Sequence, residues 1–145
     1  MKLLLDTCVL ADFYLQREDF SQSVNSIAAA GIHGDVALWA SAKSYTDIFY
    51  VGKKYFTYDV LQKAFLASLK FIHVCAIDQN DIEDASKLMW KDFEDCLINE
   101  AARKVDADFI ITRDIRGFSQ SQIKVATPNE IVDMLAKKGL FYGIV

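Results

Sequence analysis

The chain has 145 residues, of which 52% are hydrophobic, 25% are charged, six are glycine and one is proline. This length and composition are typical of one globular domain and exclude disordered and collagen-like chains. We therefore expect a single domain spanning residues 1–145. The net charge of −4 repels nucleic acid, so binding to it would need a local basic patch or a bound cation.

The apolar runs of the sequence are only a few residues long. They fall far short of the roughly 20 residues that span a bilayer, and the N-terminal residues lack the pattern of a signal peptide. Three cysteines, Cys8, Cys75 and Cys96, form no Cys-x-x-Cys pair, which favours a reducing environment over a disulfide framework or a zinc site. We expect no membrane partner and a cytoplasmic location.

Five short apolar runs alternate with longer segments that can form helices. The runs lie at residues 2–5, 36–39, 71–75, 109–111 and 123–125. Because they are continuously apolar, they are typical of strands covered on both faces, and the segments between them are long enough for crossover helices. The sequence thus predicts an α/β fold, a three-layer α/β/α domain with a mainly parallel five-stranded sheet.

Helix boundaries are marked by capping residues. The clearest start is Thr127-Pro128-Asn129-Glu130, which combines a cap, a proline at the first helical position and a capping box, and Gly139 ends that helix. Further expected caps are Asp6, Asp19, Thr57 and Asp78. The apolar tail at residues 140–145 should either pack on the domain or meet another chain.

Four aspartates are expected at one edge of the sheet. Asp6 and Asp114 follow the first and fourth predicted strands, while Asp47 and Asp95 lie near the starts of helices. Ligands of open parallel sheets bind beyond the carboxyl ends of the strands, so these side chains are candidates for a site. Each also has a structural explanation: Asp6 and Asp95 suit helix N-termini, and Asp47 can pair with Lys43 four residues earlier.

Taken together and in order, these acids resemble the motifs of PIN-domain ribonucleases, particularly toxins of the VapC type. The resemblance runs from residue 2 to about residue 135 and rests on Leu4-Leu5-Asp6-Thr7, on Asp47, on Asp92-Phe93-Glu94-Asp95 and on Ile111-Thr112-Arg113-Asp114. It implies a metal-dependent endoribonuclease that hydrolyses RNA phosphodiester bonds, the toxin component of a toxin–antitoxin pair. The implied partners are an RNA substrate, an antitoxin protein and a second copy of the chain in a homodimer.

The resemblance also implies the site. Mg²⁺ or Mn²⁺ would be held by Asp6, Asp47, Asp95 and Asp114, and Thr112 would orient Asp114 or donate to a phosphate. Converging carboxylates support the same expectation, since each close pair repels by roughly 3 to 4 kcal/mol at an effective dielectric of 20 unless a cation or proton is taken up. Carboxylate oxygens without nearby histidine or cysteine ligands favour Mg²⁺ or Mn²⁺ over Zn²⁺. His73 is expected to pack within a strand, and His33 to lie in a solvated loop.

Three positions depart from the family pattern. Position 47 is Asp where Glu is usual, position 8 is Cys where Asn is common, and Gly117 stands where close relatives often carry a further acid. The last departure bears on whether the site holds one metal ion or two. Together with the shorter Asp47, it also supports an alternative function, a catalytically inactive PIN-like module that binds RNA or protein.

Basic residues near the acids are candidates for RNA binding. Arg113 and Arg116 flank Asp114, and Lys43 lies near Asp47; an ordinary solvated surface would equally explain them. Another class of phosphate-handling α/β domain remains a rival. A haloacid-dehalogenase-type phosphohydrolase would need Asp-x-Asp after the first strand, where Cys8 stands, and a receiver would need an acid pair and a late lysine that the sequence does not place.

Overall fold

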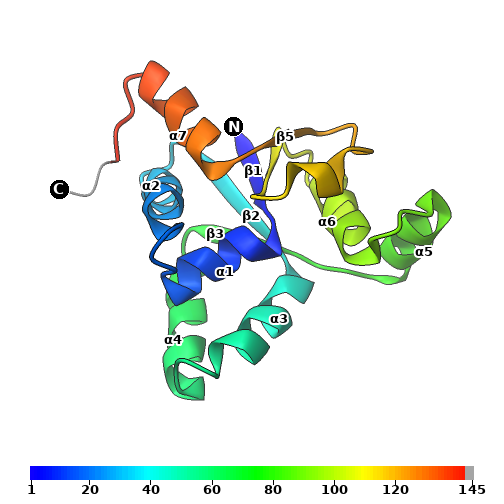
Figure 1. Cartoon of the computed structure of the whole chain (residues 1–145), viewed down its shortest axis with the longest axis horizontal. Coiled ribbons are helices and arrows are strands. Elements are labelled where there is room, and N and C mark those ends of the chain that lie inside the picture. The colour runs from blue at the N-terminus through cyan, green and yellow to red at the C-terminus, as the bar shows by residue number, and fades with distance from the viewer. Residues whose placement is uncertain (143–145) are drawn as a thin grey trace.

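The computed structural model describes residues 1–142, which form one five-stranded parallel sheet with helices on both faces (Figure 1). The strand order is β3-β2-β1-β4-β5, with β1 in the centre. Every neighbouring pair of strands is parallel. The strands are β1 (Lys2–Leu5), β2 (Ala37–Ser41), β3 (Ile72–Cys75), β4 (Phe109–Ile111) and β5 (Lys124–Ala126). The predicted three-layer α/β/α fold is therefore confirmed.

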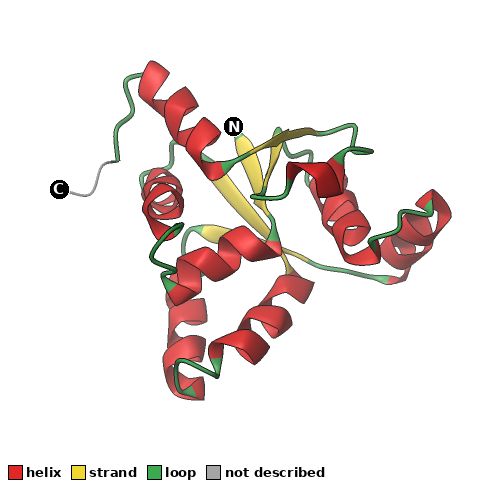
Figure 2. Ribbon diagram, in the orientation of Figure 1, coloured by secondary structure: helices red, strands yellow, loops and turns green. Residues whose placement is uncertain are grey.

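The helices occupy the segments between the strands, as the pattern predicted, and α7 follows the last strand. They are α1 (Thr7–Leu15), α2 (Ser21–Ile32), α3 (Ala42–Gly52), α4 (Tyr58–Ser68), α5 (Gln79–Leu88), α6 (Phe93–Lys104) and α7 (Pro128–Lys137), with a short 3₁₀ helix, η1 (Ile115–Phe118). Figure 2 shows these helices on either side of the central strands. None of the helices within residues 1–142 has the length and apolar character needed to cross a bilayer.

Side-chain caps fix where several helices begin. Thr127 and Glu130 form the predicted capping box of α7, and Asp6 accepts a hydrogen bond from the Thr7 N–H at the start of α1. The expectation for Asp19 was wrong: α2 begins at Ser21, and its N-cap residue, Phe20, makes no side-chain cap bond. The start of α2 therefore depends on tertiary packing rather than on a local cap.

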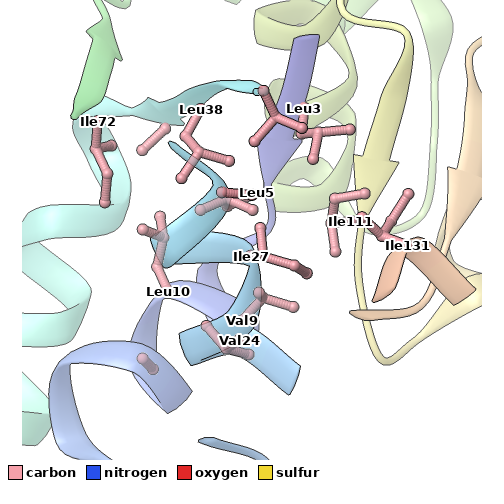
Figure 3. Close-up of a cluster of buried hydrophobic side chains, with 14 of the residues drawn as sticks. Leu3, Leu5, Val9, Leu10, Val24, Ile27, Leu38, Ile72, Ile111 and Ile131 are labelled. Atoms are coloured by element: carbon pink, nitrogen blue, oxygen red, sulfur yellow. The ribbon is translucent and has the colours of Figure 1, made fainter. Parts of the chain in front are cut away.

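The two faces of the sheet are filled by successive residues of the same strands. Leu3 and Leu5 of β1 point into a core formed with α1, α2 and α7, as the close-up in Figure 3 shows. Leu4, between them, points to the opposite face and packs against Ile98 of α6. Because neighbouring strand residues point to opposite faces, burial on both sides requires a continuous apolar run. This alternation fixes β1, and with it Asp6, at the centre of the molecule.

The edge strand β3 is more exposed to solvent than the central strands of the sheet. The expectation that His73 packs within its strand was wrong, because β3 is an edge strand and His73 is exposed, with its ring 5.0 Å from that of Trp39. His33 follows α2 at an exposed position, as expected.

The described part of the apolar tail packs on the domain's own flank. Leu140 and Tyr142 lie against the main core, and the Ser26 hydroxyl donates a 2.9 Å hydrogen bond to the Tyr142 carbonyl. Phe141 is 77% exposed. The rest of the predicted tail, residues 143–145, lies outside the described residues.

Candidate active site

Asp6 lies where the central strand ends and α1 begins. Its backbone N–H donates to the Ile111 carbonyl at 2.9 Å, which joins the ends of β1 and β4. Its side chain is almost fully buried, at 7% exposure, and burial raises the pKa of the carboxyl above its usual value. Three donors limit that rise: the Thr112 hydroxyl at 2.7 Å, the Thr7 N–H at 2.8 Å and the Cys8 thiol at 3.5 Å. Asp6 is thus held as a fixed oxygen acceptor at the edge of the sheet.

Thr112 connects two of the predicted site residues. Its buried hydroxyl donates to Asp6 Oδ2 and accepts a 3.0 Å hydrogen bond from the Asp114 N–H. A hydroxyl can do both at once, because it has one proton and two lone pairs. Thr112 therefore sets the distance between the end of β1 and the turn that carries Asp114.

Gly117 provides the space in which two carboxylates approach each other. A Cβ atom at this position would lie 2.5 Å from Asp95 Oδ2 and 3.0 Å from Asp114 Oδ2, both closer than normal packing allows. The Gly117 N–H also donates to Asp114 Oδ1 at 3.3 Å. The glycine that departs from the family pattern is therefore what leaves room for the oxygens of Asp95 and Asp114.

Asp95, in the first turn of α6, carries the most perturbed carboxyl of this group. Burial and the negative charges of Asp6, Asp92, Asp114 and Glu94 raise its pKa to about 7. Negative charges that destabilise an ionised carboxylate in this way also favour the uptake of a cation. The Asp95 side chain therefore has a proton that a metal ion could displace.

The Cys8 thiol lies beside Asp6 but remains protonated at neutral pH. Burial and the charge of Asp6 raise its pKa to about 11. A neutral thiol is a hydrogen-bond donor rather than a nucleophile or metal ligand. The cysteine at position 8, where Asn is common in the family, therefore still provides a hydrogen-bond donor to Asp6.

Asp47 is engaged in the ion pair that the sequence offered as its alternative role. Asp47 Oδ2 lies 2.6 Å from the Lys43 ammonium, which also lies 3.2 Å from Glu94 Oε2 on α6. Partial burial lowers the pKa of Lys43, but its bonds to Asp47 and Glu94 outweigh that effect and raise it above the usual value. Lys43 therefore joins α3 to α6 across the mouth of the site.

The four predicted aspartates line one cleft of about 370 Å³. The cleft brings together Asp6, Asp47, Asp95 and Asp114. Its other lining residues, which sequence reasoning did not assign to the site, are Thr7, Cys8, Ala11, Arg17, Ile48, Val51, Asp92 and Glu94. Glu94 is in the quoted Asp92-Phe93-Glu94-Asp95 motif, but only the proximity of α3 and α6 reveals its contact with Lys43.

The donor atoms suit a hard divalent cation, because they are carboxylate and hydroxyl oxygens and the neighbouring thiol is protonated. The space at Gly117 allows two of the carboxylates to face one point. Among residues 1–142, however, no three acidic, histidine or cysteine side chains are already close enough to ligate one ion. The carboxylates surround the cleft without forming a finished metal site.

Arg113, an expected RNA-binding residue, is exposed but pairs through its guanidinium with a buried acid. Its guanidinium donates from Nε to Asp12 Oδ2 at 2.8 Å and from Nη2 to Asp12 Oδ1 at 3.3 Å, and it lies over the Phe20 ring. Asp12 is fully buried and also pairs with Arg17 at 3.3 Å. Sequence reasoning missed Asp12, although an acid inside the apolar helix at residues 7–15 was the available signal. Arg116 is also exposed and lies on η1.

A family model described as PIN domain matches residues 2–116 of the chain. A comparison with curated proteins finds no match.

Solved structures of toxin–antitoxin proteins share the fold. The chain is similar to a Klebsiella pneumoniae protein from a toxin-antitoxin complex, with a TM-score of 0.65, 21% identity and coverage of 87% of this chain and 97% of that one. VapBC2 from Rickettsia felis, bound to a DNA fragment from its promoter, gives a TM-score of 0.64, 14% identity and coverage of 88% and 98%. Mycobacterium tuberculosis VapC20, a Sarcin-Ricin loop cleaving toxin, gives a TM-score of 0.60, 12% identity and coverage of 74% and 86%.

Proposed function

Because this chain belongs to the PIN domain family, we propose that it is a metal-dependent endoribonuclease that hydrolyses RNA phosphodiester bonds and acts as the toxin of a toxin–antitoxin pair. The observation that carries this proposal is the cleft at the ends of β1 and β4, where Asp6, Asp95 and Asp114 lie together and the pKa of Asp95 is raised to about 7. Strongly perturbed carboxyl groups in a cleft are typical of functional sites. The family assignment also disfavours the receiver and phosphohydrolase alternatives.

The cofactor in this proposal is Mg²⁺ or Mn²⁺, held by Asp6, Asp95 and Asp114, with Asp47 as the fourth expected ligand. When bound, such an ion polarises water and stabilises the negative charge that develops on a phosphate during cleavage. Asp6 is positioned by Thr112, Thr7 and Cys8, and Thr112 acts as a positioning residue for Asp114. The side chains of the protein would thus position the carboxylate oxygens, and the bound ion would supply the positive charge.

The RNA would approach across the open side of this cleft. Arg116 is the strongest candidate for contact with a phosphate, because its side chain is exposed and η1 lies directly after Asp114. Arg113 and Lys43 remain candidates but would have to exchange a carboxylate partner for the RNA.

We further propose an antitoxin partner and a homodimer. The similar solved structures include toxin–antitoxin complexes, and the chain covers 97% of one such protein and 98% of another. Large exposed apolar side chains occur on α3, on α4, in the loop between them and at the residue that follows α4. They would be costly to leave uncovered, and they are Tyr50, Tyr55, Phe56, Tyr58, Leu66 and Leu69. Light scattering of the purified chain tests the homodimer, and a monomeric mass would reject it.

The second candidate is an inactive PIN-like module that binds RNA or protein. Its specific support is the ion pair between Lys43 and Asp47, which gives one of the four expected metal ligands a protein cation as its partner.

Cleavage of RNA by the purified chain separates the two candidates. We expect cleavage with Mg²⁺ or Mn²⁺ and none with EDTA, and we expect Asp95→Asn to reduce the rate at least tenfold. Asp133→Asn, which changes an exposed carboxylate on α7, is the matched control and should leave the rate unchanged. RNA binding without metal-dependent cleavage would favour the inactive module.

A further inference from the structure

Positive charge is distributed unevenly around the cleft. On the α3 side, the Lys43 ammonium lies 2.6 Å from Asp47 and 3.2 Å from Glu94. On the β1 and β4 side, no lysine or arginine of residues 1–142 forms an ion pair with Asp6, Asp95 or Asp114. The carboxylates on one side of the cleft are therefore already paired with a protein cation, whereas those on the other side form no ion pair within the described part of the chain.

The ammonium and a divalent cation would compete for the same oxygens on the α3 side. Lys43 occupies one oxygen each of Asp47 and Glu94, and repulsion between cations disfavours a metal ion beside it. On the other side, the carboxylates of Asp6 and Asp114 accept hydrogen bonds from neutral groups, the Thr112 hydroxyl and the Gly117 N–H, respectively. These neutral donors leave the negative charge of that half available to an ion.

From this asymmetry we propose that Lys43 replaces a second metal ion and limits the cleft to one divalent cation, bound on the side of Asp6, Asp95 and Asp114. Asp47 and Glu94 then act by holding Lys43 in place, so that Asp47, the fourth ligand expected from the sequence, does not contact the ion. This inference rests on the proposed metal-dependent function and deepens it, because it assigns the number of ions and a positioning role to Lys43.

Titration calorimetry with Mn²⁺ tests the inference without measuring activity. We expect one ion per chain for the wild type and two for Lys43→Met, because the substitution removes the ammonium and leaves Asp47 and Glu94 without a cation. Lys43→Arg keeps the charge and should bind one ion. Lys63→Met removes an exposed ammonium from α4 and serves as the matched control, again with one ion expected. Melting curves of all four proteins verify that each is folded.

The possible failures are distinguishable. If the wild type cleaves RNA with Mn²⁺ and Lys43→Met still binds one ion with unchanged affinity, this inference is wrong and the proposed function stands. Two ions bound by the wild type would lead to the same conclusion. If none of the four proteins binds Mn²⁺, both this inference and the metal-dependent function are overturned.

Discussion

At Asp95, burial and neighbouring negative charge act in the same direction, and both favour the protonated carboxyl. The pKa rises from an ordinary value of 3.8 to about 7. Between these two values the folded protein holds a proton that the unfolded chain has lost. The Asp95 carboxyl should therefore lower the stability of the metal-free protein progressively as pH rises from about 4 to about 7.

Asp95→Asn should remove this pH dependence. We expect the metal-free variant to gain stability relative to the wild type as pH rises from 5 to 8, by about 1 to 2 kcal/mol, because the carboxyl is only partly buried and solvent screens part of the effect. Urea unfolding of both proteins at each pH measures the difference in the free energy of unfolding. The contribution of the two histidines to the pH dependence cancels, because both proteins contain them. Parallel stability profiles would mean that the pKa of Asp95 is not raised.

Gly117 offers a test of the metal site that leaves the fold largely intact. A methyl group at this position would meet Asp95 Oδ2 at 2.5 Å and displace it. We expect Gly117→Ala to weaken Mn²⁺ binding about tenfold, roughly 1.4 kcal/mol, while changing the metal-free melting temperature little. Calorimetric titration measures the affinity, and unchanged binding would remove Asp95 from the site.

At the scale of secondary-structure elements, Asp12 joins α1 to the end of β4. Its carboxylate is fully buried and accepts two hydrogen bonds from Arg113. Asp12→Asn keeps the side-chain size but removes the charge that holds both Arg113 and Arg17, so we expect a loss of about 1 to 3 kcal/mol in the free energy of unfolding.

The matched control for this prediction is Asp19→Asn, which alters an exposed acid in the loop between α1 and α2. It should change the free energy of unfolding by less than about 0.5 kcal/mol. Denaturant unfolding measures both variants. Equal stabilities would show that the buried ion pair contributes nothing.

The strands were predictable from sequence because a strand that is buried on both faces of the sheet appears as a continuous apolar run. The run at 109–111 coincides with β4, and the run at 36–39 begins one residue before β2. The exposure of His73 was not predictable, because whether a strand lies at an edge depends on strand order. The same limit applies to the site: motifs placed its acids near one another, but the contact of Lys43 with Glu94 requires the packing of α3 beside α6.

At the scale of the whole molecule, metal binding should appear as stability. An ion that binds only the folded state contributes about 2.7 kcal/mol at a hundredfold excess over its Kd. For a chain of this size we expect the melting temperature to rise by roughly 5 to 10 °C with Mn²⁺. Asp6→Asn should reduce this rise, and Asp133→Asn should not. Identical melting curves with and without the ion would contradict a metal site.

The hydrogen bond between Thr112 and Asp6 also has a consequence for synthesis. The two residues are 106 positions apart in the chain. At a translation rate of about 5 to 20 residues per second, Asp6 leaves the ribosome roughly 5 to 20 seconds before Thr112 is available to it. During that interval β1 also lacks β4, its neighbour on one side. A nascent chain therefore cannot assemble the cleft until translation has passed β4, which delays any activity of the site until most of the protein has been made.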